Sequence, residues 1–142
     1  MFNGISLVKV MGRHAGFIAG GATIASQDVN FCLIPESRFT LEGLITALKE
    51  RLERRGHAVI VVAEGAGQEL MQASGQCDAS GNLQYGDIGI FLRDRIKQQF
   101  KAIGMEVNLK YIDPSYMIRS LPAHARDAAF CLLLGHSAVH AG

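Results

Sequence analysis

Charged and hydroxyl-bearing side chains follow three apolar runs of this 142-residue sequence. Gly12 and Arg13 come at the end of "SLVKVM", Glu64 comes directly after "AVIVVA", and Tyr116 and Arg119 come after "NLKYI". Arginine side chains form paired hydrogen bonds with phosphate oxygens, and a carboxylate accepts hydrogen bonds from sugar hydroxyls. This combination of residue types suits the binding of a phosphorylated polyol.

The position of Arg13 points to an anion. It stands near the expected start of a helix, where free N–H groups and the helix dipole favour negative charge. An arginine there is explained if an anion lies between its side chain and the helix N-terminus. Lys110, near the end of the last apolar run, adds a further positive charge. If the runs are parallel strands, all of these side chains project toward one edge of the sheet.

Each of these side chains also has a purely structural explanation. Arg13 and Lys110 are equally well explained as solvated surface charges. Glu64 would cap a helix that begins within "GAGQEL", and Arg119 would form a surface ion pair with Asp113. A single glycine-rich turn such as "GAG" is weak evidence for phosphate binding, because glycine turns follow many strands.

Composition argues against several other classes of protein. The net charge of +1 leaves no basic surface for nucleic acid, and no apolar run reaches the roughly 20 residues of a membrane span. His136 and His140 have no third partner for a metal, and no G-x-S-x-G motif indicates a hydrolase. Cys32, Cys77 and Cys131 lack metal-binding spacing, and we expect two buried thiols, Cys32 and Cys131, and one loop thiol, Cys77, in a reducing compartment.

Apolar runs alternate along the chain with patterns of helical period. The alternation predicts strands at 4–11, 30–36, 58–62 and 106–114, and helices at 14–27, 41–55, 88–103 and 127–142. Thr40 is the expected N-cap of the second helix and Gly56 its stop, and the polar stretch 74–86 is an excursion or small hairpin. We therefore expect a single α/β domain over 1–142, a three-layer fold with a mostly parallel sheet flanked by helices. The apolar last helix indicates that the chain is part of a larger protein.

Four motifs, "VKVMGRHAGFIA", "CLIPE", "VVAEGAGQ" and "LKYIDPSYMIR", together resemble the 6-phosphofructokinase family. The resemblance is to the branch that includes the plant ATP-dependent enzymes and the pyrophosphate-related ones, and it covers nearly the whole chain. It implies a phosphofructokinase-like, Rossmann-type half. It also implies a glycolytic activity, in which a phosphoryl group passes from ATP or pyrophosphate to the 1-hydroxyl of fructose 6-phosphate.

The resemblance assigns roles to individual residues. The substrate-binding residues it implies are Met11, Gly12, Arg13, Glu64, Lys110, Tyr116 and Arg119. Met11 to Arg13 match an element that contacts fructose 6-phosphate and the reacting region, so Arg13 is a candidate for stabilising the transferring phosphoryl group. Glu64 matches a glutamate that holds sugar hydroxyls.

The remaining matches concern the sugar phosphate and its neighbours. Tyr116 and Arg119 match a Tyr-x-x-Arg element that holds the sugar and its 6-phosphate. Lys110 matches a basic position that reaches the 6-phosphate of a neighbouring subunit, which implies a homo-oligomer. Glu36, in "CLIPE", matches a position that is structural within the family.

Two family elements have no counterpart in these 142 residues: the glycine-rich donor-phosphate loop and the Thr-Ile-Asp segment with the catalytic aspartate. We therefore expect the sugar-phosphate-binding part of a phosphofructokinase, without the nucleotide part, inactive alone, and with Mg²⁺ bound mainly outside this chain. The alternatives are a non-catalytic sugar-phosphate-binding or regulatory module, and a relic that does not fold alone. The expected compartment is the cytoplasm, or a plastid if a transit peptide precedes the sequence.

Overall fold

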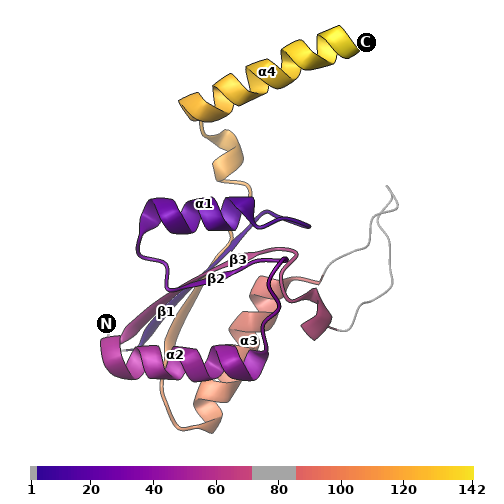
Figure 1. Ribbon diagram of the computed structural model, residues 1–142. Helices are drawn as coiled ribbons and strands as arrows, with labels where there is room; N and C mark the ends of the chain where they lie inside the picture. The colour runs from indigo at the N-terminus through magenta and orange to yellow at the C-terminus, as the bar shows by residue number, and fades with distance from the viewer. Residues whose placement is uncertain (1–2, 72–85) are drawn as a thin grey trace.

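A parallel sheet organises the residues that this computed structural model describes, 3–71 and 86–142. Its strands are β1 (Gly4–Val10), β2 (Phe31–Leu33), β3 (His57–Ala63) and β4 (Asn108–Ile112), in the order β2-β3-β1-β4. All three strand pairings are parallel. The first strand in the sequence, β1, is therefore an inner strand, between β3 and β4, the last strand in the sequence (Figure 1).

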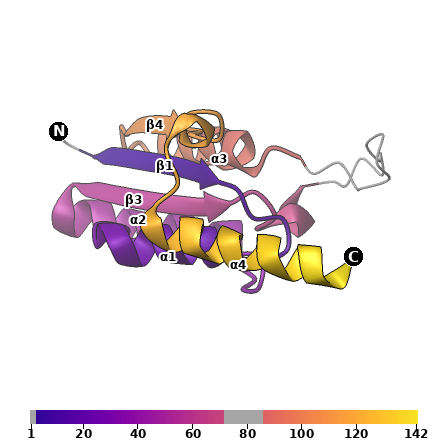
Figure 2. The ribbon, with the colours of Figure 1, turned by 90° about the horizontal axis from the view of Figure 1, so that it is seen from above.

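Helices cover the two faces of the sheet unequally. Helix α1 (Phe17–Ser26) lies on one face, and α2 (Leu41–Arg55) and α3 (Ile88–Ala102) lie on the other (Figure 1). Helix α4 (Ala125–Ala141) lies beyond α1 and away from the sheet, and Figure 2 shows it on the α1 side in the view from above. Short 3₁₀ turns occur at η1 (Gln68–Leu70) and η2 (Ile118–Ser120). The expected three-layer α/β fold is confirmed.

Strand alternation divides the core into two clusters. Ile5 and Leu7 of β1 point to the α2/α3 face, where they join a large cluster with Leu48 and Phe100. The α1 face holds a smaller cluster of short side chains, namely Val10, Ala19, Val61 and Ala63. Strand β3 contributes to both clusters, which explains its unbroken apolar sequence.

Helix α2 has the ends that its sequence predicts. The Thr40 hydroxyl accepts a hydrogen bond from the Gly43 N–H at 3.1 Å, and Gly56 follows the helix with a φ of 71°. A side-chain oxygen at the N-cap satisfies one of the free N–H groups, and glycine takes a left-handed φ without steric cost. Both expectations are confirmed.

Other element boundaries differ from the expected ones. Helix α1 begins at Phe17 rather than at residue 14, because the Glu36 carboxylate binds the Gly16 N–H and makes Gly16 the N-cap. Strand β2 ends at Leu33, because a turn closed by a hydrogen bond from the Ser37 N–H to the Ile34 carbonyl follows it.

Two expectations about the cysteines and the last helix are corrected. Cys32 is half-buried, and Cys131 is exposed because α4 has no buried residue within the described part of the chain. Helix α4 begins at Ala125, two residues earlier than expected, where the His124 side chain accepts a hydrogen bond from the Arg126 N–H. Cys77 and the polar stretch up to residue 85 lie outside the described residues.

Candidate functional site

Two loops meet at the carboxyl ends of β1 and β3. The Glu64 N–H donates to the Val10 carbonyl and the Gly65 N–H donates to the Gly12 carbonyl, each at 3.0 Å. A side chain at Gly65 would overlap the Arg13 carbonyl oxygen, so only glycine permits this approach. Gly12 has a φ of +139°, which other residues rarely adopt. These glycines bring the Met11–Arg13 loop and the Glu64 loop together, as the parallel sheet predicts.

The side chains of Arg13 and Glu64 face each other across this junction. The Arg13 Nε lies 4.0 Å from the Glu64 Oε1, and the two side chains are 43% and 39% exposed. An ion pair with this exposure contributes little to stability, at most about 1 kcal/mol. Glu64 does not cap a helix, because Gly67 precedes η1 and no side chain caps it. Both groups are therefore open to solvent at the edge of the sheet.

Arg119 reaches the same junction from the connection after β4. Its Nη2 lies 3.8 Å from the Met11 Sδ. The alternative ion pair between Arg119 and Asp113 is not formed, because Asp113 is bound by Lys9 and Ser115. The residues brought together are thus Met11, Gly12, Arg13, Glu64 and Arg119.

Tyr116 and Lys110 stand apart from this contact group. The Tyr116 side chain lies in the same connection as Arg119 but is 87% exposed, with no hydrogen bond within residues 3–71 and 86–142. Lys110 is the middle residue of β4 and pairs in register with Ser6 of β1. On β1, Ser6 lies five residues before Met11, a distance of roughly 16 Å at 3.3 Å per residue. The expectation that Lys110 projects toward the carboxyl edge is therefore wrong.

Glu36 occupies the helix N-terminus at which an external anion was expected beside Arg13. Its two carboxylate oxygens accept hydrogen bonds from the Gly16 N–H at 2.8 and 3.1 Å. A carboxylate at this place complements the helix dipole. The sequence interpretation is therefore corrected in one respect: Arg13 lies before the helix, and the negative group at the helix N-terminus belongs to Glu36.

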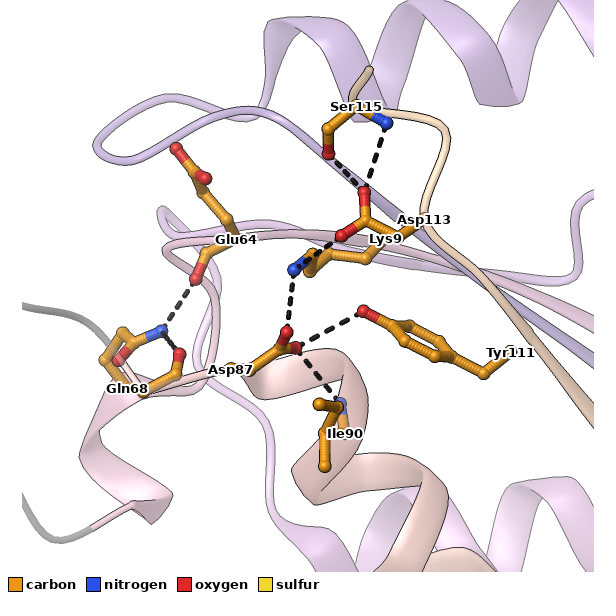
Figure 3. Close-up of polar contacts among 9 residues, drawn as sticks. Lys9, Glu64, Gln68, Asp87, Ile90, Tyr111, Asp113 and Ser115 are labelled. Carbon is orange, nitrogen blue, oxygen red and sulfur yellow. Dashed lines mark hydrogen bonds and ion pairs between the residues drawn. The ribbon is translucent and has the colours of Figure 1, made fainter. Parts of the chain in front are cut away.

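An ion cluster that the sequence analysis missed lies near Glu64 at the same end of the sheet; its lysine is mostly buried and its two aspartates are about one-third exposed (Figure 3). The Lys9 ammonium is 2.9 Å from the Asp87 Oδ2 and 2.9 Å from the Asp113 Oδ2. Asp87 is the N-cap of α3 and also accepts hydrogen bonds from the Ile90 N–H and the Tyr111 hydroxyl. We call Lys9, Asp87, Tyr111 and Asp113 the Lys9 cluster. The sequence signal for this cluster was strand alternation, which places Lys9 on the same face of β1 as the buried Ile5 and Leu7.

The pKa values in the Lys9 cluster favour its charged forms. Burial acts to lower the pKa of Lys9, but its contacts with Asp87 and Asp113 outweigh burial and raise the pKa above its ordinary value. Burial opposes ionisation of Asp87, yet the hydrogen bond from Lys9 lowers its pKa below the ordinary value. The hydrogen bond from Ser115 is the largest cause that lowers the pKa of Asp113, and Lys9 adds to it. Burial, followed by the Asp87 charge, raises the pKa of Tyr111.

The carboxylates near the junction do not form a magnesium site. Lys9 binds both Asp87 and Asp113, and Glu64 faces Arg13. Across residues 3–71 and 86–142, no three His, Cys, Asp or Glu side chains are arranged to hold a metal ion. The same residues include no helix that is long and apolar enough to cross a membrane.

Comparison with known proteins decides the family. A family model described as phosphofructokinase matches residues 1–142, the whole chain. The chain belongs to the phosphofructokinase family. The resemblance drawn from the four motifs is thereby confirmed, and the fold agrees with it.

Individual relatives support this assignment along the whole chain. ATP-dependent 6-phosphofructokinase 7 of Arabidopsis thaliana is 54% identical over 144 residues, covering 97% of this chain and 30% of the relative. The ATP-dependent 6-phosphofructokinase of Borreliella burgdorferi is 52% identical over 150 residues, covering 99% of this chain and 34% of the relative. This phosphofructokinase chain thus spans about a third of the length of these curated relatives.

A solved structure gives the same fold. The crystal structure of a pyrophosphate-dependent phosphofructokinase from Marinobacter aquaeolei superposes with a TM-score of 0.69, over 98% of this chain and 32% of that chain. The two sequences are 24% identical, so this likeness speaks for the fold alone.

Proposed function

We propose that residues 1–142 are the sugar-phosphate-binding part of a glycolytic 6-phosphofructokinase, which transfers a phosphoryl group to the 1-hydroxyl of fructose 6-phosphate. The observation that carries the proposal is that the Arg13–Glu64 pair and Arg119, which contacts Met11 in the Met11–Arg13 loop, gather at the carboxyl edge of the sheet. Two guanidinium groups and one carboxylate match a ligand that has both phosphate oxygens and hydroxyl groups. Membership of the phosphofructokinase family supports the choice of ligand.

Each residue has a distinct part in the proposed complex. Arg119 and Tyr116 bind the 6-phosphate and the sugar, Glu64 accepts hydrogen bonds from sugar hydroxyls, and Met11 to Arg13 lie against the reacting end. The ion pair of Arg13 and Glu64 is half-exposed and 4.0 Å long, so a ligand can replace it at little cost. In the proposed complex the Arg13 side chain binds phosphoryl oxygens and the Glu64 side chain binds hydroxyls.

Chemistry in this proposal requires groups from outside these 142 residues. Phosphoryl transfer depends on positioning and on neutralising the oxygens of the transferred group, and Arg13 supplies one positive charge there. The donor-phosphate loop, the catalytic aspartate and the Mg²⁺ ligands belong to the remainder of the enzyme. ATP is the proposed donor, because the Arabidopsis and Borreliella relatives are named ATP-dependent; pyrophosphate is the alternative.

The first experiment uses the 142-residue chain by itself. We expect fructose 6-phosphate to bind in calorimetry, and we expect no turnover in a coupled assay with Mg²⁺ and either ATP or pyrophosphate. Turnover that survives a control for kinases of the expression host would contradict the division of labour proposed above. Binding without turnover also fits a non-catalytic regulatory module, so a second experiment is needed.

The second experiment is a chimera in which this chain replaces the matching segment of the Arabidopsis relative. We expect the chimera to phosphorylate fructose 6-phosphate. Arg119→Ala in the chimera removes a charge-assisted hydrogen bond, which weakens substrate affinity roughly tenfold to a hundredfold, mainly through KM. Arg126→Ala, on exposed α4, is the matched control and leaves KM unchanged. A folded chimera that binds the sugar phosphate without turnover would favour the regulatory module.

Lys110 tests the proposed homo-oligomer. The side chain lies on an exposed edge strand and has no ion pair among the described residues, which leaves it accessible to a neighbouring subunit. If it reaches the neighbour's 6-phosphate, Lys110→Glu subunits mixed with Glu64→Gln subunits regain activity above either parent. Activity equal to the average of the parents, with subunit exchange demonstrated, would place Lys110 outside a shared site. The proposed compartment is the cytoplasm, with a plastid as the alternative.

A further inference from the structure

Lys9 occupies a core-facing position of β1. Ile5 and Leu7 on the same face of the strand are buried in the large cluster, and Lys9 continues this row at the carboxyl end. Its side chain is only 15% exposed. A lysine at such a position is costly unless its charge is paired, because burial penalises the charged form.

The pairing of Lys9 joins three separate segments of the chain. Its ammonium contacts Asp87 at the start of α3 and Asp113 just after β4, both at 2.9 Å (Figure 3). The remaining oxygens of the two carboxylates also have partners: Asp87 Oδ1 binds the Ile90 N–H and the Tyr111 hydroxyl, and Asp113 Oδ1 binds Ser115. Lys9 thus binds two carboxylates, each of which also accepts a hydrogen bond from a nearby backbone N–H.

The two halves of this arrangement serve different parts of the molecule. Asp87 caps α3, a helix with five buried residues, so its half contributes to the stability of the core. Asp113 closes the turn at Ser115 and begins the connection that carries Tyr116 and Arg119. Neither Asp113 nor Ser115 belongs to the core clusters of the described residues, so this second half bears on where the connection leaves the sheet.

We propose that Lys9 is a positioning residue for the sugar-phosphate site: by holding Asp113 against the end of β1, it fixes Arg119 beside Met11 and Arg13. The inference rests on the proposed function for its ligand, but not for its geometry. Lys9 is assigned no direct contact with the ligand, because its charge is already neutralised by the two carboxylates. Arg119 touches the sugar phosphate, and Lys9 acts through it.

Two matched variants separate positioning from stability. Asp87→Asn and Asp113→Asn each weaken one of two equal contacts of the same ammonium. Asp87→Asn is expected to lower the melting temperature and leave the KM for fructose 6-phosphate within about twofold in the chimera. Asp113→Asn is expected to raise that KM about tenfold with a smaller change in melting temperature and kcat within about threefold. Equal KM values for the two variants, measured where both are folded, would overturn the proposal.

A double-mutant cycle tests whether Lys9 acts through Arg119. Lys9→Met keeps the length of the side chain and removes its charge, and it is expected to raise KM about tenfold. In the Arg119→Ala background the same change is expected to raise KM less than threefold, because the group that Lys9 positions is absent. Full additivity of the two effects would contradict the proposal, since it would mean that Lys9 contacts the ligand or acts independently.

A ligand-free measurement keeps this inference distinct from the proposed function. Amide hydrogen exchange is expected to quicken in residues 115–121 on Lys9→Met and on Asp113→Asn, and to stay unchanged there on Asp87→Asn. This segment includes the Ile118 N–H, which donates to the Pro114 carbonyl. Faster exchange in Lys9→Met, found in a protein that does not bind fructose 6-phosphate, would support the positioning role of Lys9 and reject the proposed function. Unchanged exchange on Lys9→Met would reject the positioning.

Discussion

The two faces of the sheet differ in how far they are covered. On the α2/α3 face, Leu48, Ile60 and Phe100 are completely buried. On the α1 face, Phe17 and Ile24 are 87% and 78% exposed, and α4 has no buried residue. Most of the stability of the described chain must therefore come from one face, while apolar surface on the other contributes little.

The cause of the difference lies in the helices themselves. Helix α2 places Leu44, Leu48 and Leu52 at the spacing of one helix face, and all three are buried. Helix α1 buries only Ala19, and Gly20 and Gly21 leave open space around it. Apolar composition and burial are therefore separate properties: α4 is rich in apolar residues, yet none of its residues is buried in the described part of the chain.

The largest expected effect contrasts two phenylalanines. Phe100→Ala on the covered face removes a completely buried ring and should lower the free energy of unfolding by about 3–5 kcal/mol. Phe130→Ala on α4 should change it by less than about 0.5 kcal/mol, because Phe130 is already exposed. Urea denaturation of both variants measures the difference. Similar losses in the two variants would mean that α4 is covered in solution.

The second contrast concerns two glycines. Gly65→Ala places a methyl group against the Arg13 carbonyl oxygen and should destabilise the chain by about 1–3 kcal/mol, while it displaces the loop of the candidate site. Gly20→Ala, in α1, meets no atom and should stabilise the chain by about 0.5–1 kcal/mol. Thermal unfolding shows both signs at once. A harmless Gly65→Ala would contradict the close approach of the two loops.

A smaller effect is expected at the N-terminus of α2. Thr40→Ala removes the hydroxyl that accepts the Gly43 N–H and should cost about 1 kcal/mol of stability. Thr40→Ser keeps the hydroxyl and should stay within a few tenths of a kcal/mol of the wild type. Chemical denaturation of the pair separates the hydrogen bond from the loss of a methyl group. Equal losses would rule out the cap as the cause.

The smallest effect is expected in the pH dependence of stability. The pKa values of Asp87 and Asp113 are lowered in the folded chain. Their contribution to the free energy of unfolding is therefore complete above the ordinary carboxyl pKa of about 3.9, and it is lost as the pH falls through the pKa values of the folded state. The raised pKa of Lys9 keeps its contribution complete below pH of about 10.4. Stability should therefore fall below pH 4, and less so in Lys9→Met. Denaturation between pH 7 and pH 3 tests this; identical slopes would contradict it.

Local patterns predicted the fold well, and long-range contacts explain what they did not predict. Apolar runs and helix-period patterns predicted the bounds of the strands and helices to within a few residues, and Thr40 was predicted as the N-cap of α2. The parallel sheet then brings Arg13 near Glu64, because its carboxyl ends share an edge. The contacts of Lys9 with Asp87 and Asp113 join positions far apart in the sequence, which no local pattern encodes. Lys110 was misplaced because the register of β4 against β1, which places it opposite Ser6, is a long-range feature that no local pattern encodes.

The order of the strands has a consequence for synthesis of the chain. Strand β1 leaves the ribosome before the other three strands of this sheet, and its partner β4 follows about 100 residues later. At 5–20 residues per second this is a delay of roughly 5–20 seconds. Strand β3, the other partner of β1, is complete much earlier and is available for pairing during this time. The edge of β1 that binds β4 stays unpaired until β4 has been made. Asp113, which directly follows β4, contacts Lys9 only after β4 has paired with β1. The candidate site is therefore among the last parts of this sheet to be assembled.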